Sequence, residues 1–216
     1  MEKDVVVIGL GIFGHEVAVQ LQEKGKKVLA VDVDEAEIHR IRDHVTGAVI
    51  ASVTDEEALA ALDLSKFEFV ILGLGSNFEQ LVLGITYLRK LGVKYIIARA
   101  NTEIQQEILL KIGANEVILP EKHSAQRLAE RIARPNIAEM LEIDENVNLA
   151  EIKVDDRLAD KTLRELDLRR KYNITALLLK RDGQRPRVIT DPELKLLAGD
   201  YLVVLGTHDD ILNTFS

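Results

Sequence analysis

The chain has 216 residues, 47% of them hydrophobic and 30% charged, as in an ordinary globular protein of one or two domains. It has no cysteine, which excludes disulfides and cysteine-ligated metals, and no apolar run reaches the roughly 18 residues of a membrane span. The net charge of −8 and the 4% aromatic content argue against nucleic-acid binding, which calls for a basic face with stacking aromatics.

The first expected element is a buried strand over 5–8 that runs into a glycine turn of the form G-x-G-x-x-G. In dinucleotide sites the first glycine permits a sharp turn, the second lets backbone approach a phosphate, and the third lets the helix pack closely. The helix start then offers free N–H groups to the phosphates. A purely structural turn is the alternative. The pattern predicts a nucleotide-binding loop made of Gly9, Gly11, Ile12, Phe13 and Gly14.

A second expected strand, over 28–32, ends in an acid. Asp32 follows the glycine turn at the spacing of about 20 residues that is typical of a ribose-binding carboxylate. Val33 and Asp34 come next, and Asp34 either reaches the ribose edge or the adenine side, or simply caps the helix expected from Glu35. Two acids at this point would repel a 2′-phosphate, which disfavours NADP.

The loops after the third and fourth strands, expected near 48–51 and 69–72, reach the same edge of a doubly wound sheet. The first loop is expected beside the adenine, with Thr54 or Asp55 as a competing helix cap, and it contains Ser52, Val53 and Thr54. The second loop is either a ligand-crossing segment of small residues or a plain turn, and it contains Gly73, Leu74 and Gly75.

Two charged residues complete the candidate site. Arg99 ends the fifth strand, so its charge should emerge at the same crevice, either as a phosphate ligand or in a salt bridge with a neighbouring acid. Glu121 opens the helix expected over 121–134, where the helix dipole favours an acid whatever the function. A ligand or metal role for Glu121 would require bound phosphates or a neighbouring subunit.

Strand-like runs alternate with amphipathic segments as far as residue 134, which predicts an α/β fold: a doubly wound parallel (Rossmann) sheet over 1–134. Pro135 breaks the rhythm. We expect a linker over 135–146, in which 136–144 forms a short connection that can be helical. Short strands with turn chemistry, including Asp182-Gly183, then predict a small α+β domain over 147–216. Its basic cluster, interleaved with acids, is interpreted as a solvated face and consists of Arg164, Arg169, Arg170 and Lys171.

No recognisable pattern of catalytic residues occurs in the sequence. No pair of histidines has metal-ligand spacing, and no Tyr-x-x-x-Lys base pair of short-chain dehydrogenases occurs. A nucleotide site without evident chemistry indicates a sensor. The alternatives are an NAD-dependent oxidoreductase and a stand-alone Rossmann nucleotide-binding module.

The chain resembles the cytosolic Trk/Ktr-type regulatory subunits of potassium-uptake systems, which join an RCK (or KTN) domain to a small RCK-C domain. The segments that carry the resemblance are 7–14, 31–34, 111–115, 117–121 and 196–206. The resemblance implies a gating subunit that binds ATP or ADP, with NAD(H) as the alternative. It also implies that Arg99 faces the phosphates and that Glu121 holds Mg²⁺ or Ca²⁺ there. In one departure, Ile12 replaces the arginine that usually reaches the γ-phosphate, so ATP, ADP and NAD stay open.

The resemblance also implies partners. Homodimers formed through the crossover helix would assemble into a ring, expected to be an octamer, on a membrane potassium pore. In some members the C-terminal domain binds a cyclic dinucleotide. The resemblance implies a location in the cytoplasm, at the inner face of the membrane through the pore partner. The first strand begins by Val5, which leaves no room for a signal peptide and agrees with this expectation. No nucleic-acid partner is expected.

Overall fold

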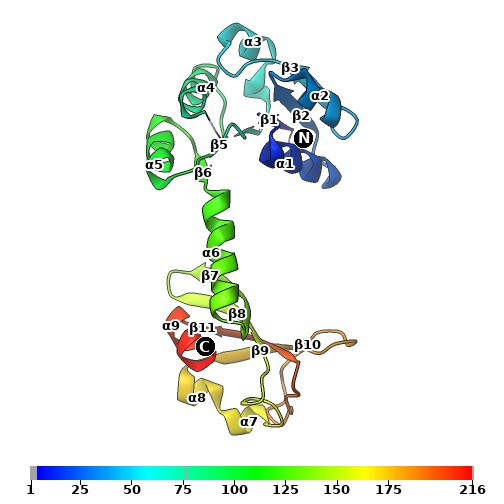
Figure 1. Cartoon of the computed structure of the whole chain (residues 1–216), viewed down its shortest axis with the longest axis vertical. Helices are drawn as coiled ribbons and strands as arrows, with labels where there is room; N and C mark the ends of the chain where they lie inside the picture. The colour runs from blue at the N-terminus through cyan, green and yellow to red at the C-terminus, as the bar shows by residue number, and fades with distance from the viewer. Residues whose placement is uncertain (1–3, 76, 216) are drawn as a thin grey trace. The chain divides into compact units, whose positions relative to one another are not determined.

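A computed structural model describes residues 4–75 and 77–215 of the chain. The residues group into two compact units, Met1–Ser124 and Ala125–Ser216, whose helices and strands are labelled in Figure 1. Each unit has its own sheet and its own hydrophobic core.

The first unit is built on a six-stranded sheet in the order β3-β2-β1-β4-β5-β6, in which every pairing is parallel. This is the doubly wound arrangement that the sequence predicts. The strand order reverses between β1 and β4, and ligands of such sheets bind outside the strand ends at this point. The strands are β1 (Val5–Ile8), β2 (Val28–Asp32), β3 (Gly47–Ile50), β4 (Phe69–Leu72), β5 (Ile96–Arg99) and β6 (Glu116–Ile118).

Helices cover both faces of this sheet, as the burial of β1 shows. Val6 and Ile8 belong to one hydrophobic cluster, whereas Val5 and Val7 belong to another, because successive side chains of a strand point to opposite faces. Helix α4 contributes to the first cluster and helices α1 and α2 contribute to the second. The helical elements are α1 (Ile12–Glu23), α2 (Glu35–Ile41), α3 (Glu56–Ala61), the 3₁₀ turn η1 (Leu64–Lys66), α4 (Phe78–Lys90), α5 (Glu103–Ile112) and α6 (Pro120–Ala133).

The second unit is an antiparallel sheet in the order β10-β9-β11-β8-β7. The expected turn at Asp182-Gly183 is confirmed, since it joins the antiparallel pair β9 and β10, and Gly183 has a φ of 69°. The elements are β7 (Ile137–Asp144), β8 (Val147–Lys153), α7 (Leu163–Leu166), α8 (Leu168–Tyr172), β9 (Thr175–Lys180), β10 (Arg187–Val188), β11 (Tyr201–Gly206) and α9 (His208–Phe215).

The expectation of a helical connection over 136–144 was wrong, because this segment is strand β7. It pairs with β8 in a hairpin in which Leu141 lies opposite Leu149. Leu141 and Ile143 alternate with acidic residues, but both are exposed on this edge strand. Most of the segment 135–146 thus belongs to the second sheet.

No helix in the described part of the chain is both long enough and apolar enough to cross a membrane.

Candidate functional site

The glycine turn after β1 has a backbone that larger residues would not fit. Gly9 has a φ of +89°, which side chains rarely adopt. A Cβ atom at Gly14 would lie 1.8 Å from the carbonyl oxygen of Gly9. The backbone of the first turn of α1 therefore packs in direct contact with the loop. The two positions together fix how the helix leaves the sheet.

The start of α1 is open in the way that an anion site requires. A Cβ at Gly11 would meet no atom within 4 Å, so space lies in front of this residue. No side chain caps the helix and no acid occupies its first turn, so N–H groups of this turn have no side-chain acceptor and carry partial positive charge. The side chain of Ile12 is 97% exposed. Phosphate oxygens are suitable acceptors for these donors.

Asp32 lies at the end of β2 and fastens the glycine loop. One carboxylate oxygen accepts a hydrogen bond from the backbone N–H of Leu10 at 2.5 Å, and the other accepts from the N–H of Asp34 at 2.9 Å. Each oxygen keeps a further lone pair, which is enough to accept from a ribose hydroxyl. The structure therefore places Asp32 beside the loop and gives it a structural task in addition to the predicted one.

The predicted site residues that follow β2 and β3 have different roles in the structure: one caps a helix, one packs in the core, and others are exposed. Asp34 caps α2 by accepting from the N–H of Ala36 at 2.8 Å, which is the simpler of its two interpretations. Val33 is exposed beside it. The predicted residues after β3 also differ, because Val53 is buried in the core, whereas the hydroxyls of Ser52 and Thr54 bond to each other at 2.8 Å. The side chain of Val53 thus packs in the core.

The cap of α3 is a neighbouring residue: Asp55 accepts from the N–H of Ala58 at 3.0 Å. This leaves the hydroxyl pair of Ser52 and Thr54 at the carboxyl end of β3 free of a capping task.

The side chain of Arg99 lies close to several segments at this edge of the sheet. Its guanidinium carbon lies 5.9 Å from the ring centre of Phe13 in the glycine loop. A Cβ at Gly75, in the loop after β4, would lie 2.2 Å from an Arg99 nitrogen. Its Nη2 donates to the carboxylate of Glu121. The side chain is only 20% exposed, and its Nε–H is buried without a hydrogen-bond partner among the described residues.

Glu121 lies in the first turn of α6 and contributes one exposed carboxylate. In the part of the chain that the structure describes, no three His, Cys, Asp or Glu side chains gather into a metal site. Mg²⁺ is often held by one or two carboxylates together with phosphate oxygens and water. Glu121 fits that role only as the protein's share of a site that a nucleotide completes.

Two features of this edge were not predicted. The backbone N–H of Leu10 fastens Asp32, and the side-chain amide of Asn101 donates to the carbonyl oxygen of Gly75, so that the loops after β4 and β5 are tied together. Asn101 lies two residues after the end of β5 and directly before the helix cap Thr102, and no local sequence pattern there signals the second contact.

Comparison with known proteins gives the same architecture along the whole chain. Residues 5–120 match the TrkA-N domain and residues 149–216 match the TrkA-C domain. The chain is 37% identical over 213 residues to the Ktr system potassium uptake protein C of Bacillus subtilis (strain 168), covering 98% of this chain and 95% of that protein. It is 32% identical over 214 residues to the Ktr system potassium uptake protein A of Vibrio alginolyticus, covering 98% and 96%.

Solved structures share the fold. The crystal structure of the GsuK RCK domain superposes with a TM-score of 0.69 at 20% identity, over 100% of this chain and 47% of that one. The GsuK channel bound to NAD gives a TM-score of 0.68 at 20% identity, over 97% and 38%. The chain thus spans less than half of each of these solved chains, and at this identity the likeness concerns the fold.

The family found by these comparisons consists of regulatory proteins and not of enzymes. This agrees with the missing catalytic residues. With both domain matches in order and full-length relatives above 30% identity, the chain belongs to the Ktr/TrkA family of potassium-uptake regulatory proteins.

Proposed function

We propose that the first unit binds an adenine nucleotide at the glycine loop and that its occupancy regulates a membrane potassium transporter. The single observation that carries the proposal is Arg99. Its side chain is only 20% exposed, it lies beside the glycine loop, and its buried Nε–H lacks an acceptor among the described residues. A buried donor without a partner is costly, and a phosphate oxygen would supply the partner. The uncapped start of α1 adds further donors on the same edge.

The candidate nucleotides ADP, NAD and ATP differ in the number of phosphates that the site would have to bind. Ile12 brings no charge to the helix start, so the cation argued from the structure is Arg99, which already shares a bond with Glu121. We expect ADP and the pyrophosphate of NAD to satisfy this site, and a third phosphate to gain little. Solved GsuK structures with NAD and with ADP show that this fold accommodates both types of ligand.

The first prediction concerns Arg99→Gln. Loss of one charge-assisted hydrogen bond to phosphate, about 2 kcal/mol, should weaken ADP binding roughly 30-fold, measured by isothermal titration calorimetry. Arg40→Gln, the same charge change on exposed α2, is the control and should bind as the parent does. Arg99→Lys should retain part of the affinity. Equal affinities of parent and Arg99→Gln for ADP, ATP and NAD would contradict a phosphate role.

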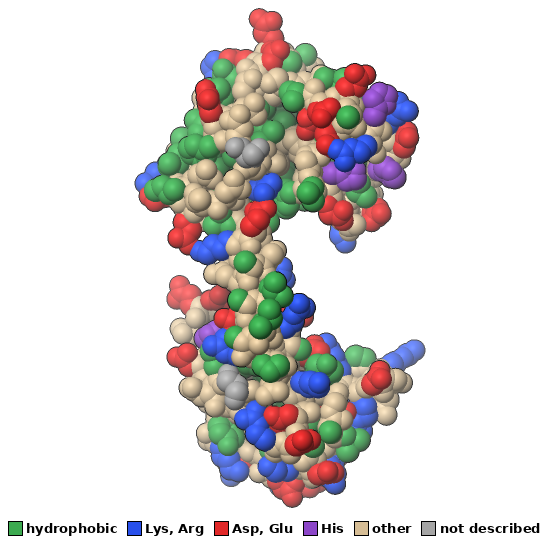
Figure 2. Space-filling view, viewed as in Figure 1, with side chains coloured by type: hydrophobic (Ala, Val, Ile, Leu, Met, Phe, Trp, Pro, Cys, Tyr) green, Lys and Arg blue, Asp and Glu red, His purple; other side chains and the backbone are tan. Residues whose placement is uncertain are grey.

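Helix α6 points to self-association. None of its residues is buried, yet an apolar stripe at helical spacing runs along it and consists of Ala125, Leu128, Ala129 and Ile132. Ile132 is 72% exposed and Leu128 48%, and hydrophobic side chains are visible on this helix in Figure 2. A second copy of the same stripe would cover it symmetrically. We infer a homodimer through α6, assembled into a ring at a potassium pore.

The second prediction tests this interface. Ile132→Asp should reduce the mass measured by light scattering to that of the next smaller species, because a carboxylate would be buried in an apolar contact. Arg127→Gln makes the same change in net charge on the other side of α6 and should leave the mass unchanged. An unaltered oligomer in Ile132→Asp would place the contact elsewhere.

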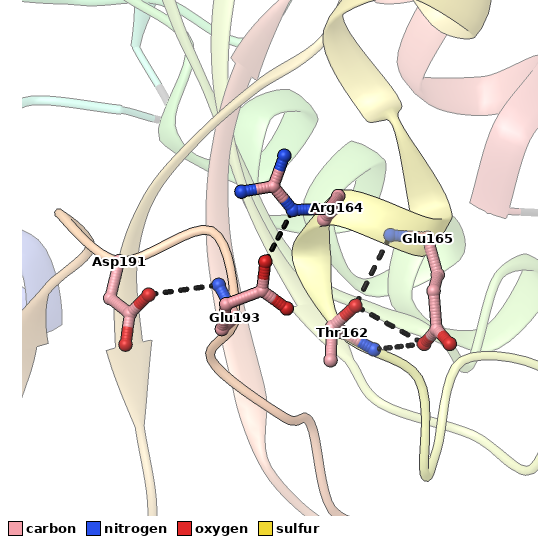
Figure 3. Close-up of polar contacts among 5 residues, drawn as sticks. All are labelled: Thr162, Arg164, Glu165, Asp191 and Glu193. Carbon is pink, nitrogen blue, oxygen red and sulfur yellow. Dashed lines mark hydrogen bonds and ion pairs between the residues drawn. The ribbon is translucent and has the colours of Figure 1, made fainter.

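A second ligand is proposed for the second unit. A cavity of about 500 Å³ there is lined by several basic residues, among them Arg164, Arg169 and Arg170. The Arg164 side chain donates a hydrogen bond to the carboxylate of Glu193 (Figure 3). The backbone N–H of Glu193 in turn donates to the carboxylate of Asp191 at 2.9 Å. Arg169 and Arg170 are thereby the cations available to the phosphates of a cyclic dinucleotide. Calorimetry with Arg169→Gln would test this site.

A further inference from the structure

A separate cavity of about 540 Å³ lies in the second unit, lined by residues that precede α7 and by residues of α7, α8 and α9. Its apolar wall includes Leu158, Leu166, Tyr172 and Phe215. Phe215 is almost fully buried, whereas Tyr172 is 44% exposed, so the wall runs from the core to the surface. A cavity of this volume whose lining combines apolar side chains with charged ones can hold a small molecule that has an apolar part and a polar part.

The charges around this cavity oppose those of the whole chain. Arg157, Lys161 and Lys171 line it, and Glu165 is the acid among its lining residues, although the chain carries a net charge of −8. The carboxylate of Glu165 is committed locally: it accepts from the backbone N–H of Thr162 at 2.7 Å and from its hydroxyl at 3.1 Å (Figure 3). Glu165 keeps its negative charge, but three cations line the cavity against this one acid, so the lining carries a net positive charge.

Two of the three cations form no ion pair among the described residues. Arg157 is paired with Asp155 at 2.7 Å, which neutralises it. The ammonium of Lys161 donates to the carbonyl oxygen of Arg157 at 2.6 Å, and that of Lys171 donates to the carbonyl oxygen of Glu165 at 3.3 Å. Within residues 4–75 and 77–215, no carboxylate forms an ion pair with either lysine. An ammonium has three donors, so each lysine can also bind an anionic group.

We propose that this cavity binds a small organic anion with an apolar body and one phosphate or carboxylate group. Leu158, Leu166 and Tyr172 would contact the body, and Lys161 and Lys171 would bind the head group. Both halves are required, since exposed lysines alone hold anions weakly. The site is distinct from the glycine loop and from the cavity at Arg164, and it does not depend on the nucleotide proposal.

The test is a fluorescence titration of the full chain with 1-naphthyl phosphate and with 1-naphthoate. At least one should bind saturably, and the tighter of the two identifies the head group. Neutral 1-naphthol has only the apolar body and inorganic phosphate has only the anionic head group. Each should therefore bind at least about tenfold more weakly than the tighter naphthyl anion. Absence of saturable binding by both naphthyl anions would overturn the proposal, as would naphthol binding equally well.

Variants locate the probe. Lys161→Gln and Lys171→Gln should each weaken binding about threefold to fivefold, as expected for exposed ion pairs. Lys153→Gln, an exposed lysine of β8 that does not line the cavity, should have no effect. Affinity that falls in Arg169→Gln or in Arg99→Gln, but not in the two cavity variants, would put the probe at another site and refute the assignment.

Discussion

Gly14 is a position where the structure excludes any side chain. The Cβ of an alanine would overlap the carbonyl oxygen of Gly9 at 1.8 Å, so the glycine loop and α1 would have to separate. Gly11, three residues earlier in the same motif, has an ordinary φ of −57° and open space in front of it. The two glycines therefore differ: Gly14 is needed for the packing of α1 on the loop, and we propose that Gly11 leaves room for a ligand.

The third prediction uses this contrast. Gly14→Ala should lower the free energy of unfolding by about 3 kcal/mol through overpacking, measured by urea unfolding followed by circular dichroism. Gly11→Ala should change it by less than about 1 kcal/mol and yet weaken ADP binding, because its methyl group enters the phosphate space. Equal stability losses in the two variants would contradict this division of roles.

The predictability of the site also differs from residue to residue. The sequence indicates Arg99, Asp32 and the glycines because each occupies the carboxyl end of a strand in a known sheet order. The tie between Asn101 and Gly75 joins loops far apart in the chain, which no local pattern encodes. Val53 lies in the predicted loop, but its side chain is buried because α4 packs against it, and this packing is not visible in the local sequence.

At the scale of elements, the turn before β11 depends on one buried acid. Asp200 accepts from Nε and Nη2 of Arg181, both at 2.7 Å, and from the N–H of Leu197 at 2.9 Å. The hydrogen bonds from the Arg181 guanidinium hold the pKa of Asp200 below its ordinary value. Ionised Asp200 thus stabilises the second unit, and this contribution is complete above the unfolded-state pKa of about 4.

The fourth prediction follows from this direction of the pH dependence of stability. Asp200→Asn should cost about 2 kcal/mol of unfolding free energy at neutral pH, and the difference from the parent should shrink as the pH falls below about 4, where the parent's carboxylate takes up a proton. Urea unfolding at several pH values measures this. Asp156→Asn, on an exposed residue, is the control, and a difference that grows on acidification would refute the argument.

Elements with a strong local pattern are the ones that the sequence predicts. The apolar runs of the central strands β1 and β4 are buried on both faces of the parallel sheet, and a glycine follows each of them, so these strands are evident. Strand β7 lacks that signal, because Leu141 and Ile143 face solvent and its identity comes from pairing with β8. The sequence likewise indicates only a solvated face at Lys171. The cavity that Lys171 lines together with Lys161 is formed by tertiary packing, which no local pattern reveals.

At the scale of the whole molecule, α6 begins in the first unit and ends in the second. Its first turn carries Glu121, the partner of Arg99. A ligand that competes for Arg99 therefore acts on the first turn of the helix that continues into the other unit. Such a ligand shifts an equilibrium between conformations only if it binds them with different affinities.

The fifth prediction concerns Glu121→Gln. Nucleotide affinity without divalent cations should stay within about threefold of the parent, because Glu121 is exposed and forms a surface pair. The gain in affinity on adding Mg²⁺ or Ca²⁺ should diminish, since one cation ligand is lost. Calorimetry with and without the cation measures both effects. Glu107→Gln on α5 is the control, and a cation effect unchanged in Glu121→Gln would remove this residue from the metal site.

The hydrogen bond from Leu10 to Asp32 has a consequence for the timing of the response. It holds the glycine loop in place by contacts within the chain itself, so the nucleotide binding proposed above would require no ordering of the loop. Association with a preformed site is limited mainly by encounter, and differences in affinity then reside in dissociation rates. Nucleotides that share the site would be distinguished by how long each one stays, and the duration of a signal would be set by departure of the ligand.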